Sequence, residues 1–98
     1  MELKGKVAIV TGASSGVGSD TAHQLAQHGA RGVINYAKSR AGAEATVQRV
    51  TEAGGDGLVV QADVSDDSQC RALVNAALEA YGQRDVLVNN AGTTTYVE

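Results

Sequence analysis

Short continuous apolar runs recur along the chain and are separated by longer stretches of mixed polarity. Four such runs, at residues 7–10, 33–36, 58–60 and 86–88, consist mostly of β-branched residues or leucine. An apolar run without polar alternation is typical of a strand buried on both faces, as in a parallel sheet. The pattern therefore predicts four buried strands.

The three stretches between the runs have helical length, and the third has the clearest helical period. Its apolar residues recur every three or four positions along one helix face: Cys70, Leu73, Val74, Ala77, Leu78 and Tyr81. Ser65 is placed to cap this helix. Asp66 and Asp67 suit the positive end of its dipole, and Gly82 ends it.

The first and second stretches also carry apolar residues at helical spacing. The first, over residues 17–26, ends at Gly29, and the second, over residues 41–50, ends at Gly54. Strands and helices therefore alternate along the chain. Because parallel neighbours need crossover connections, which are right-handed, this order predicts an α/β fold with an open parallel sheet and helices on both faces.

Length and composition restrict the remaining possibilities. A chain of 98 residues with 43% apolar and 19% charged residues forms at most one globular domain. A net charge of −3 without a basic cluster argues against a nucleic-acid groove. The single cysteine, Cys70, excludes an intrachain disulfide, and the N-terminal apolar run is too short for a signal peptide or a membrane span. We expect a cytoplasmic protein without nucleic-acid or membrane partners.

The segment TGASSGVG joins the first predicted strand to the first predicted helix. Its glycines fit neither the G-x-G-x-x-G spacing nor a P-loop, but each has a physical use at a nucleotide site. Gly12 lets the chain turn sharply, Gly16 leaves a pyrophosphate unobstructed at the helix N-terminus, and Gly18 allows the helix to pack closely on the sheet. Ser14 and Ser15 add hydroxyl and backbone donors. The alternative is a Gly/Ser-rich loop that only closes a βα connection.

Together with ADV at residues 62–64 and LVNNAG at residues 87–92, this segment resembles the motifs of the short-chain dehydrogenases/reductases, in the same order and at similar spacing. The resemblance covers essentially all 98 residues, and VINYAKS is most similar to bacterial 3-oxoacyl-carrier-protein reductases and related keto-reductases and sugar dehydrogenases. It implies the N-terminal half of a Rossmann-type doubly wound parallel sheet, with three helices and four strands in the order 3-2-1-4. It also implies a homo-oligomer for the full-length protein.

The resemblance assigns roles to individual residues. The glycine segment matches the turn that holds the diphosphate and ribose: Gly12, Ser14, Ser15, Gly16, Val17 and Gly18. Asp63 and Val64 match the adenine contacts. A third group matches the stretch from the adenine-side ribose toward the nicotinamide: Asn90, Ala91 and Gly92. Asn89 matches a residue that ties the central strands together. Without the family, Asp63 is better interpreted as a helix cap or surface acid, and NNAG as a plain turn.

The end of the second strand bears on the choice between NAD and NADP. NAD-binding proteins tend to carry an acid there that binds both ribose hydroxyls, and the stretch has none. Its residues are Asn35, Tyr36, Ala37, Lys38, Ser39 and Arg40. The last three are suited to a 2′-phosphate, so NADP is the predicted cofactor and NAD the alternative. Ser15 departs from this pattern, because many NADP-preferring relatives have a basic residue there. A solvated loop is the other interpretation of Lys38 and Arg40.

The proton-transfer chemistry of the family needs groups that this sequence does not contain. A tyrosine exchanges a proton with the substrate oxygen, a lysine four residues later lowers the tyrosine pKa, and a serine polarises the carbonyl. In the family these residues and a supporting asparagine follow the NNAG segment, and no Tyr-x-x-x-Lys occurs in the chain. We therefore predict no catalytic residue here. His23, His28 and Cys70 are interpreted as core or surface residues rather than metal ligands.

Residues 1–98 are thus predicted to be the dinucleotide-binding segment of an NADP(H)-dependent oxidoreductase with a small carbonyl or alcohol substrate, whose catalytic part is absent. The alternative is a non-catalytic nucleotide-binding or interaction module. A methyltransferase is disfavoured, because such enzymes usually carry an acid where Asn35 stands. We also expect the last strand, residues 86–89, to be an unprotected sheet edge that makes the chain alone prone to aggregation.

Overall fold

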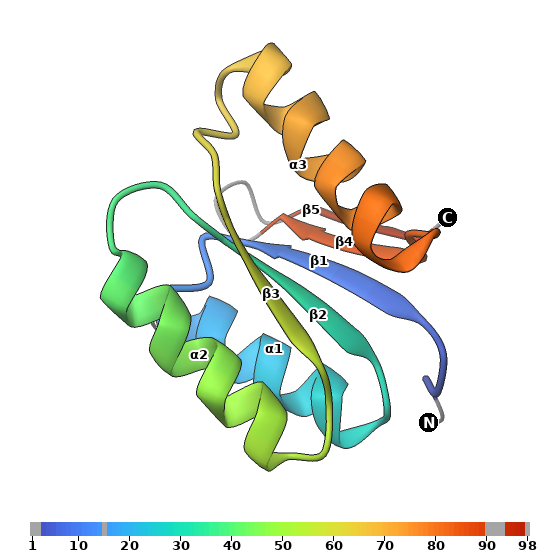
Figure 1. Ribbon diagram of the computed structural model, residues 1–98. Helices are drawn as coiled ribbons and strands as arrows, with labels where there is room; N and C mark the ends of the chain where they lie inside the picture. Colours follow the sequence, from blue (N-terminus) through green and yellow to red (C-terminus); the bar gives the residue numbers. More distant parts are fainter. Residues whose placement is uncertain (1–2, 15, 90–93, 98) are drawn as a thin grey trace.

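The computed structural model describes residues 3–14, 16–89 and 94–97, which form three helices and five strands (Figure 1). Along the chain these are β1 (Val7–Thr11), α1 (Gly16–Gln27), β2 (Arg31–Tyr36), α2 (Arg40–Glu52), β3 (Gly57–Gln61), α3 (Asp67–Tyr81), β4 (Val86–Asn89) and β5 (Thr94–Val97). All the predicted strands and helices are present, with bounds that differ by a few residues. The α/β fold class is confirmed.

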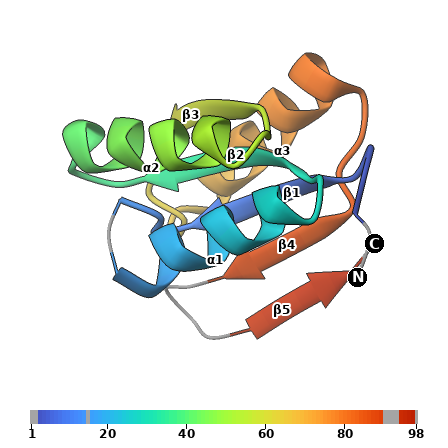
Figure 2. The same ribbon diagram turned by 90° about the horizontal axis from the view of Figure 1, so that it is seen from below.

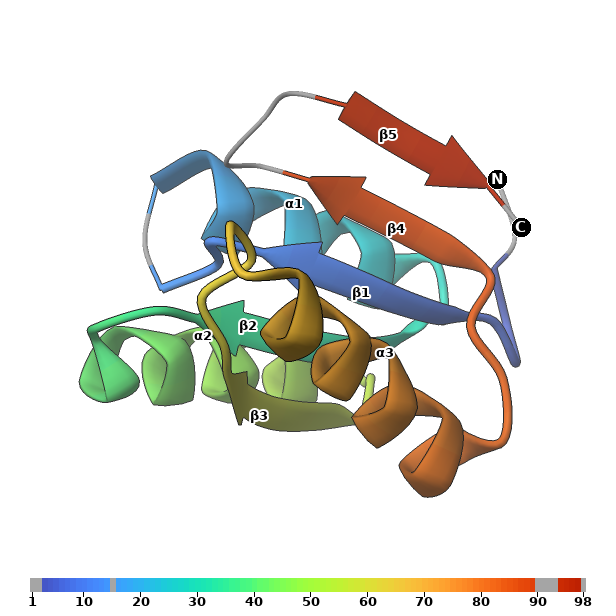
Figure 3. The same ribbon diagram turned by 90° about the horizontal axis from the view of Figure 1, so that it is seen from above.

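The strands form one sheet in the order β3-β2-β1-β4-β5 (Figure 3). β1 pairs in parallel with β2 on one side, where Ile9 lies opposite Val33, and with β4 on the other, where Ile9 lies opposite Leu87. β3 adds in parallel to the outer side of β2. The predicted order 3-2-1-4 is confirmed, and it is the order of the N-terminal half of a Rossmann-type sheet.

The sequence pattern does not predict β5, which pairs antiparallel with β4 so that Leu87 lies opposite Tyr96. Because β5 lies beside β4, the expectation that β4 is an open edge is wrong. The segment has the β-branched and aromatic composition of a strand, with Thr94, Thr95, Tyr96 and Val97. Hydrophobic periodicity does not indicate which strand such a segment pairs with.

Helices cover both faces of the sheet, with α1 and α2 on one side and α3 on the other (Figure 2). Each face has its own buried cluster: Val10 and Ile34 belong to the cluster of α1 and α2, whereas Ile9, Val33 and Leu73 belong to that of α3. Successive side chains of a strand point to opposite faces, so burial on both faces requires a continuous apolar run. Each fully buried valine, isoleucine or leucine contributes about 1.5–3 kcal/mol of transfer free energy.

The third helix begins one residue later than predicted. Asp66, and not Ser65, is its N-cap, and the Asp66 carboxylate accepts hydrogen bonds from the N–H of Ser68 at 2.9 Å and from its hydroxyl at 2.7 Å. Ser65 is engaged elsewhere, because its N–H and hydroxyl both donate to the Asp63 carboxylate. Gly82 ends the helix as predicted, with a left-handed φ of 74°.

Asp66 makes the stability of the fold depend on pH. The pKa of its carboxyl lies below the ordinary value of 3.8, first because the Ser68 hydroxyl donates to it and next because the backbone N–H groups of Gln69 and Ser68 do. A carboxyl whose pKa is lower in the folded than in the unfolded state stabilises the fold above the unfolded pKa. That contribution is lost as the pH falls through the folded pKa.

Asp66→Asn should therefore flatten the acid limb of the stability profile, because asparagine still caps a helix but does not titrate. We expect its free energy of unfolding, from urea denaturation, to fall less between neutral pH and pH values below 3.8 than that of the unsubstituted protein. Asp66→Ala also removes the hydrogen-bond acceptor of the N-cap. Its free energy of unfolding should be lower at every pH but should depend on pH as weakly as that of Asp66→Asn. Parallel profiles for the unsubstituted protein and Asp66→Asn would contradict this assignment.

Candidate dinucleotide-binding site

The predicted site residues gather at the carboxyl ends of the parallel strands. β1 continues into the turn at Gly12, β2 into Ala37 and β3 into Ala62. The crossovers that leave β1 and β2 run over one face through α1 and α2, and the crossover that leaves β3 runs over the other face through α3 (Figure 3). The chain therefore changes faces between β1 and β4, and open α/β sheets bind ligands at such a switch point.

A sizeable cavity among the described residues lies elsewhere. It has a volume of about 570 Å³ and is an open depression at the amino ends of the strands, between Lys4, Gly29, Arg31, Gly55 and Asp56. Its lining comes from the loops that enter the strands, and none of the predicted site residues contributes to it. We place the candidate site at the carboxyl ends, where the residues with dinucleotide-binding chemistry converge.

The glycine turn leaves the N-terminus of α1 open to a ligand. Gly12 and Gly16 both have a φ of 60°, a left-handed conformation that glycine adopts without strain. A Cβ at Gly16 would meet nothing within 4 Å, and the neighbouring Val17 is 70% exposed, whereas Gly18 is buried. The first turn of α1 contains no acidic residue, and N–H groups at a helix start have no partner within the helix. This arrangement fits an anion of phosphate size and hence the diphosphate of a dinucleotide.

Asn35 lies at the end of β2 with only 2% of its surface exposed, and backbone groups hold its side chain. Its Nδ2 donates to the carbonyls of Val60 at 3.2 Å and Ala62 at 3.1 Å. Its Oδ1 accepts from the Gly12 N–H at 3.2 Å, and its own carbonyl accepts from the Ala13 N–H at 2.9 Å. Asn35 therefore joins the glycine turn to the ends of β2 and β3. Its predicted contact with the cofactor stays a prediction. We call its contacts with the backbone of the turn, β2 and β3 its holding role.

The stretch after β2 is shaped by the start of α2. Ser39 is the N-cap of α2, and its hydroxyl accepts from the Gly42 N–H at 3.1 Å. Arg40 donates to the Tyr36 hydroxyl at 3.3 Å and to the Glu44 carboxylate at 3.2 Å. These partners, Tyr36 first, raise the pKa of the Arg40 guanidinium. Two of the three side chains predicted to meet a 2′-phosphate, Ser39 and Arg40, thus already have partners within the protein.

Lys38 and Asp63 follow neighbouring strands and carry opposite charges. Both are exposed, and the Asp63 carboxylate accepts from the Ser65 hydroxyl at 2.6 Å and from the Ser65 N–H at 3.0 Å. The pKa of the Asp63 carboxyl is lowered first by the Ser65 hydroxyl, then by the Ser65 N–H, with a further contribution from the Lys38 charge. The partly buried Val64 packs against the cluster under α3. The carboxylate is thus oriented, ionised and exposed, as binding of an adenine amino group requires, and that predicted role stays a prediction.

The remaining predicted contacts begin where β4 ends. Asn89 lies opposite Thr11 at the end of β1, and the Thr11 hydroxyl donates to the Val88 carbonyl at 3.3 Å. The end of β4 is therefore adjacent to the start of the glycine turn. Four predicted cofactor residues lie outside the described residues, and their roles stay predictions: Ser15, Asn90, Ala91 and Gly92.

Sequence reasoning does not single out Thr46 or Gly42, both of which touch the glycine turn from α2. The Thr46 hydroxyl donates to the Ala13 carbonyl at 2.7 Å. A Cβ at Gly42 would lie 2.3 Å from the Ser14 carbonyl oxygen, so the first turn of α2 rests directly on the glycine turn. The one signal in the sequence is a polar residue on the otherwise apolar face of the second predicted helix.

Two other kinds of site were sought in the described part of the chain. There, no three or more histidine, cysteine, aspartate or glutamate side chains come together in a way that could hold a metal ion. None of the helices described combines the length and the apolar character needed to cross a membrane.

Over residues 6–98 the chain matches the short chain dehydrogenase family, and it belongs to that family. It is 56% identical over 91 residues to an uncharacterized oxidoreductase of Methylorubrum extorquens, which covers 93% of the chain and 37% of the relative. It is 38% identical over 97 residues to the short-chain dehydrogenase/reductase homolog YusS of Bacillus subtilis, covering 99% of the chain and 89% of that relative.

The chain is also similar to reductases of known type and to solved structures of the family. The chain is 44% identical over 89 residues to a 3-oxoacyl-[acyl-carrier-protein] reductase of Staphylococcus aureus, covering 91% of the chain and 36% of the reductase. A substituted short-chain dehydrogenase/reductase of Serratia marcescens superimposes with a TM-score of 0.87 at 41% identity, over 92% of this chain and 37% of its own. The chain thus spans a little over a third of the length of several relatives, and the resemblance to the reductases of this family is confirmed.

Proposed function

We propose that residues 1–98 form the NADP(H)-binding domain of an oxidoreductase that transfers hydride between a nicotinamide cofactor and a carbonyl or alcohol substrate. The observation that carries this proposal is the open glycine turn before α1 at the switch point of the sheet. Family membership supports a nicotinamide cofactor, and the name of the S. aureus relative supports a carbonyl substrate. In this proposal the protein is cytoplasmic and homo-oligomeric when full length.

Different residues bind different parts of the cofactor in this proposal. The glycine turn and the first turn of α1 bind the diphosphate, Asp63 binds the adenine amino group, and Val64 packs beside the adenine ring. Lys38 meets the 2′-phosphate. The segment after β4 continues toward the nicotinamide with Asn90, Ala91 and Gly92. The bound nicotinamide supplies or accepts hydride, and the residues of this chain bind and orient it.

Fluorescence titration with NADPH tests the proposal, and calorimetric titration with S-adenosylmethionine tests the methyltransferase alternative. We expect saturable binding of NADPH and none of S-adenosylmethionine. If neither NADPH nor NADH binds to the folded protein, the proposed function is wrong.

A non-catalytic nucleotide-binding module is the second candidate, favoured by the match over 89% of the length of YusS. For both candidates we expect no ketone reduction by residues 1–98, because the chain contains no Tyr-x-x-x-Lys. NADPH oxidation with a reactive ketone above the protein-free rate would reveal a proton donor of another kind. Joining the catalytic part of a related reductase to this chain separates the candidates, since only the first predicts restored reduction.

The preference for NADP should depend on Lys38. Its ammonium is exposed after β2, whereas Ser39 caps α2 and Arg40 pairs with Glu44. Lys38→Ala should weaken NADPH binding about tenfold or more, the effect of one charge-assisted contact, and leave NADH binding within about twofold. Lys6→Ala, an equal charge change before β1, is the control. An unchanged ratio of the two dissociation constants would mean that another residue reads the 2′-phosphate.

A further inference from the structure

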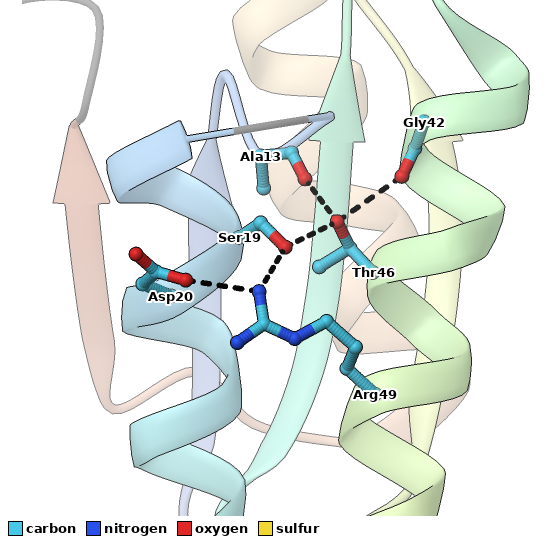
Figure 4. Close-up of polar contacts among 6 residues, drawn as sticks. All are labelled: Ala13, Ser19, Asp20, Gly42, Thr46 and Arg49. Carbon is cyan, nitrogen blue, oxygen red and sulfur yellow. Dashed lines mark hydrogen bonds and ion pairs between the residues drawn. The ribbon is translucent and has the colours of Figure 1, made fainter.

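Thr46 is a buried polar residue on α2 that makes three hydrogen bonds around the glycine turn. It is 1% exposed, and its hydroxyl lies 2.7 Å from the Ala13 carbonyl, 3.0 Å from the Ser19 hydroxyl and 3.1 Å from the Gly42 carbonyl (Figure 4). The Gly42 carbonyl, four residues earlier in the same helix, is the acceptor that a helical threonine ordinarily uses. The Ala13 and Ser19 contacts reach 33 and 27 residues away along the chain.

The donors in this cluster can be ordered by their chemistry. Arg49 can only donate, and its Nη1 lies 2.8 Å from the Ser19 hydroxyl and 3.0 Å from the Asp20 carboxylate. The Thr46 hydroxyl has one proton, and the carbonyls of Ala13 and Gly42 can only accept it; the shorter distance, 2.7 Å against 3.1 Å, favours Ala13. Ser19 is then left to donate to the Thr46 oxygen. The result is a continuous chain of hydrogen bonds from a guanidinium to a backbone carbonyl, in which each bond polarises the next.

Ala13 is the residue of the glycine turn that these bonds fix. Its N–H donates to the Asn35 carbonyl at 2.9 Å, and its carbonyl receives the Thr46 hydroxyl, so both polar groups of its backbone are engaged. Its side chain is buried in the cluster of α1 and α2. Gly12 and Gly16 have left-handed backbones, and glycine can also adopt other backbone conformations at little cost. A fixed Ala13 therefore restricts the backbone of its neighbours Gly12 and Ser14.

We propose that Thr46 is a positioning residue for the diphosphate-binding turn. Through the Ala13 carbonyl, its hydroxyl holds the turn in the conformation that leaves the N-terminus of α1 open. This inference rests on the proposed function, because it takes the diphosphate as the ligand of the turn. The diphosphate is common to NADP(H) and NAD(H), so loss of the hydroxyl should weaken both by the same factor.

Thr46→Val removes the hydroxyl at nearly constant volume and tests the inference. We expect the dissociation constants of NADPH and NADH both to rise about fivefold, the effect of one net hydrogen bond, with their ratio unchanged. Thr46→Ser, which restores the hydroxyl, should bring both back to within about twofold of the unsubstituted protein. Thr51→Val is the matched control on α2, because Thr51 is exposed and its hydroxyl donates to the Val47 carbonyl of its own helix.

A second measurement needs no cofactor. Amide hydrogen exchange in the free protein should be faster at Ala13 in Thr46→Val than in the unsubstituted protein, and unchanged there in Thr51→Val. Ser19→Ala, which breaks the link from Arg49 to Thr46 but leaves the Thr46 hydroxyl in place, should give a smaller loss of affinity than Thr46→Val. If Thr46→Val does not fold, the loss of affinity of Ser19→Ala for both cofactors tests the inference instead.

The outcomes separate this inference from the proposed function. If the unsubstituted protein binds both cofactors and Thr46→Val binds them equally well with a lower melting temperature, Thr46 only ties α2 to α1 and the inference is wrong. A selective loss of NADPH binding would also contradict it, because the hydroxyl would then act on the 2′-phosphate stretch. If the unsubstituted protein binds neither cofactor, the proposed function fails, and with it the role of Thr46 toward a diphosphate, whatever the exchange rates show.

Discussion

Replacing Asn35 with leucine is expected to lower the free energy of unfolding by about 3–5 kcal/mol, because it leaves several buried backbone groups without partners. The side chain is 2% exposed and binds the carbonyls of Val60 and Ala62 and the N–H of Gly12. Leucine has the same branching and number of heavy atoms as asparagine but can satisfy none of them. The loss is comparable to a large part of the stability of a small domain, about 5–15 kcal/mol.

Urea denaturation followed by circular dichroism measures this effect. Asn75→Leu is the matched control, since Asn75 lies exposed on α3 and the same substitution there should change the free energy of unfolding by no more than about 0.5 kcal/mol. Because Asn35 also fixes Gly12, any Asn35→Leu protein that remains folded should bind NADPH more weakly. A loss for Asn35→Leu as small as that for Asn75→Leu would mean that water replaces the amide, and the holding role would then be wrong.

The parallel strands could be predicted because burial on both faces leaves a local signature. In β1, Ile9 belongs to the cluster of α3 and Val10 to the cluster of α1 and α2, so neither position tolerates a polar residue. The strand order then follows from the length of the connections and their handedness, together with the family resemblance. These features depend on short windows of sequence, and the structure confirms them.

The features that could not be predicted depend on competition between neighbouring residues for one role, or on which other segment an element pairs with. Ser65 and Asp66 both suit an N-cap, and the choice falls on Asp66 because Asp63 engages both donors of Ser65. β5 carries strand-forming residues, but the hydrophobic pattern does not identify β4 as its antiparallel partner. Local propensity therefore predicts that an element exists more reliably than it predicts where the element ends or what it pairs with.

In the candidate site, too, the contiguous motif could be predicted from the sequence and the contacts between distant residues could not. The glycine turn could be found because its residues are contiguous and its chemistry follows from backbone freedom at a helix start. The side chains that hold it come from β2 and α2, where Asn35 follows an apolar run and Thr46 stands on an apolar helix face. In the sequence each is only a polar exception in an apolar pattern. Such an exception predicts a buried hydrogen bond, and only the structure identifies its partner.

Gly42→Ala is expected to destabilise the protein, against the ordinary effect of this substitution in a helix. Within α2 alone, alanine is favoured over glycine by about 1 kcal/mol. Here a Cβ would lie 2.3 Å from the Ser14 carbonyl oxygen and 3.0 Å from the Ser39 hydroxyl, whereas ordinary contact begins at 3.4 Å. The Ser14 oxygen is a backbone atom, so relief requires α2 and the glycine turn to separate.

We expect a net loss of about 1–3 kcal/mol in the free energy of unfolding of Gly42→Ala, the usual cost of overpacking. Because the turn must shift, NADPH and NADH should both bind about tenfold more weakly or worse. Thermal denaturation and cofactor titration measure the two effects. The control is Ala45→Gly, at an exposed position of the same helix, which should cost about 1 kcal/mol through helix propensity alone and leave both affinities unchanged.

The sign of the Gly42→Ala effect decides whether α2 rests on the turn. If α2 rests on the Ser14 carbonyl, Gly42→Ala and Ala45→Gly both lower the melting temperature, although one adds a methyl group to the helix and the other removes one. Only Gly42→Ala then weakens cofactor binding. If helix propensity alone matters, the melting temperature of Gly42→Ala rises, its affinities stay unchanged, and the turn is free of α2 at this point. The first result would mean that the start of α2 and the glycine turn are coupled, at Gly42 by contact and at Thr46 by a hydrogen bond.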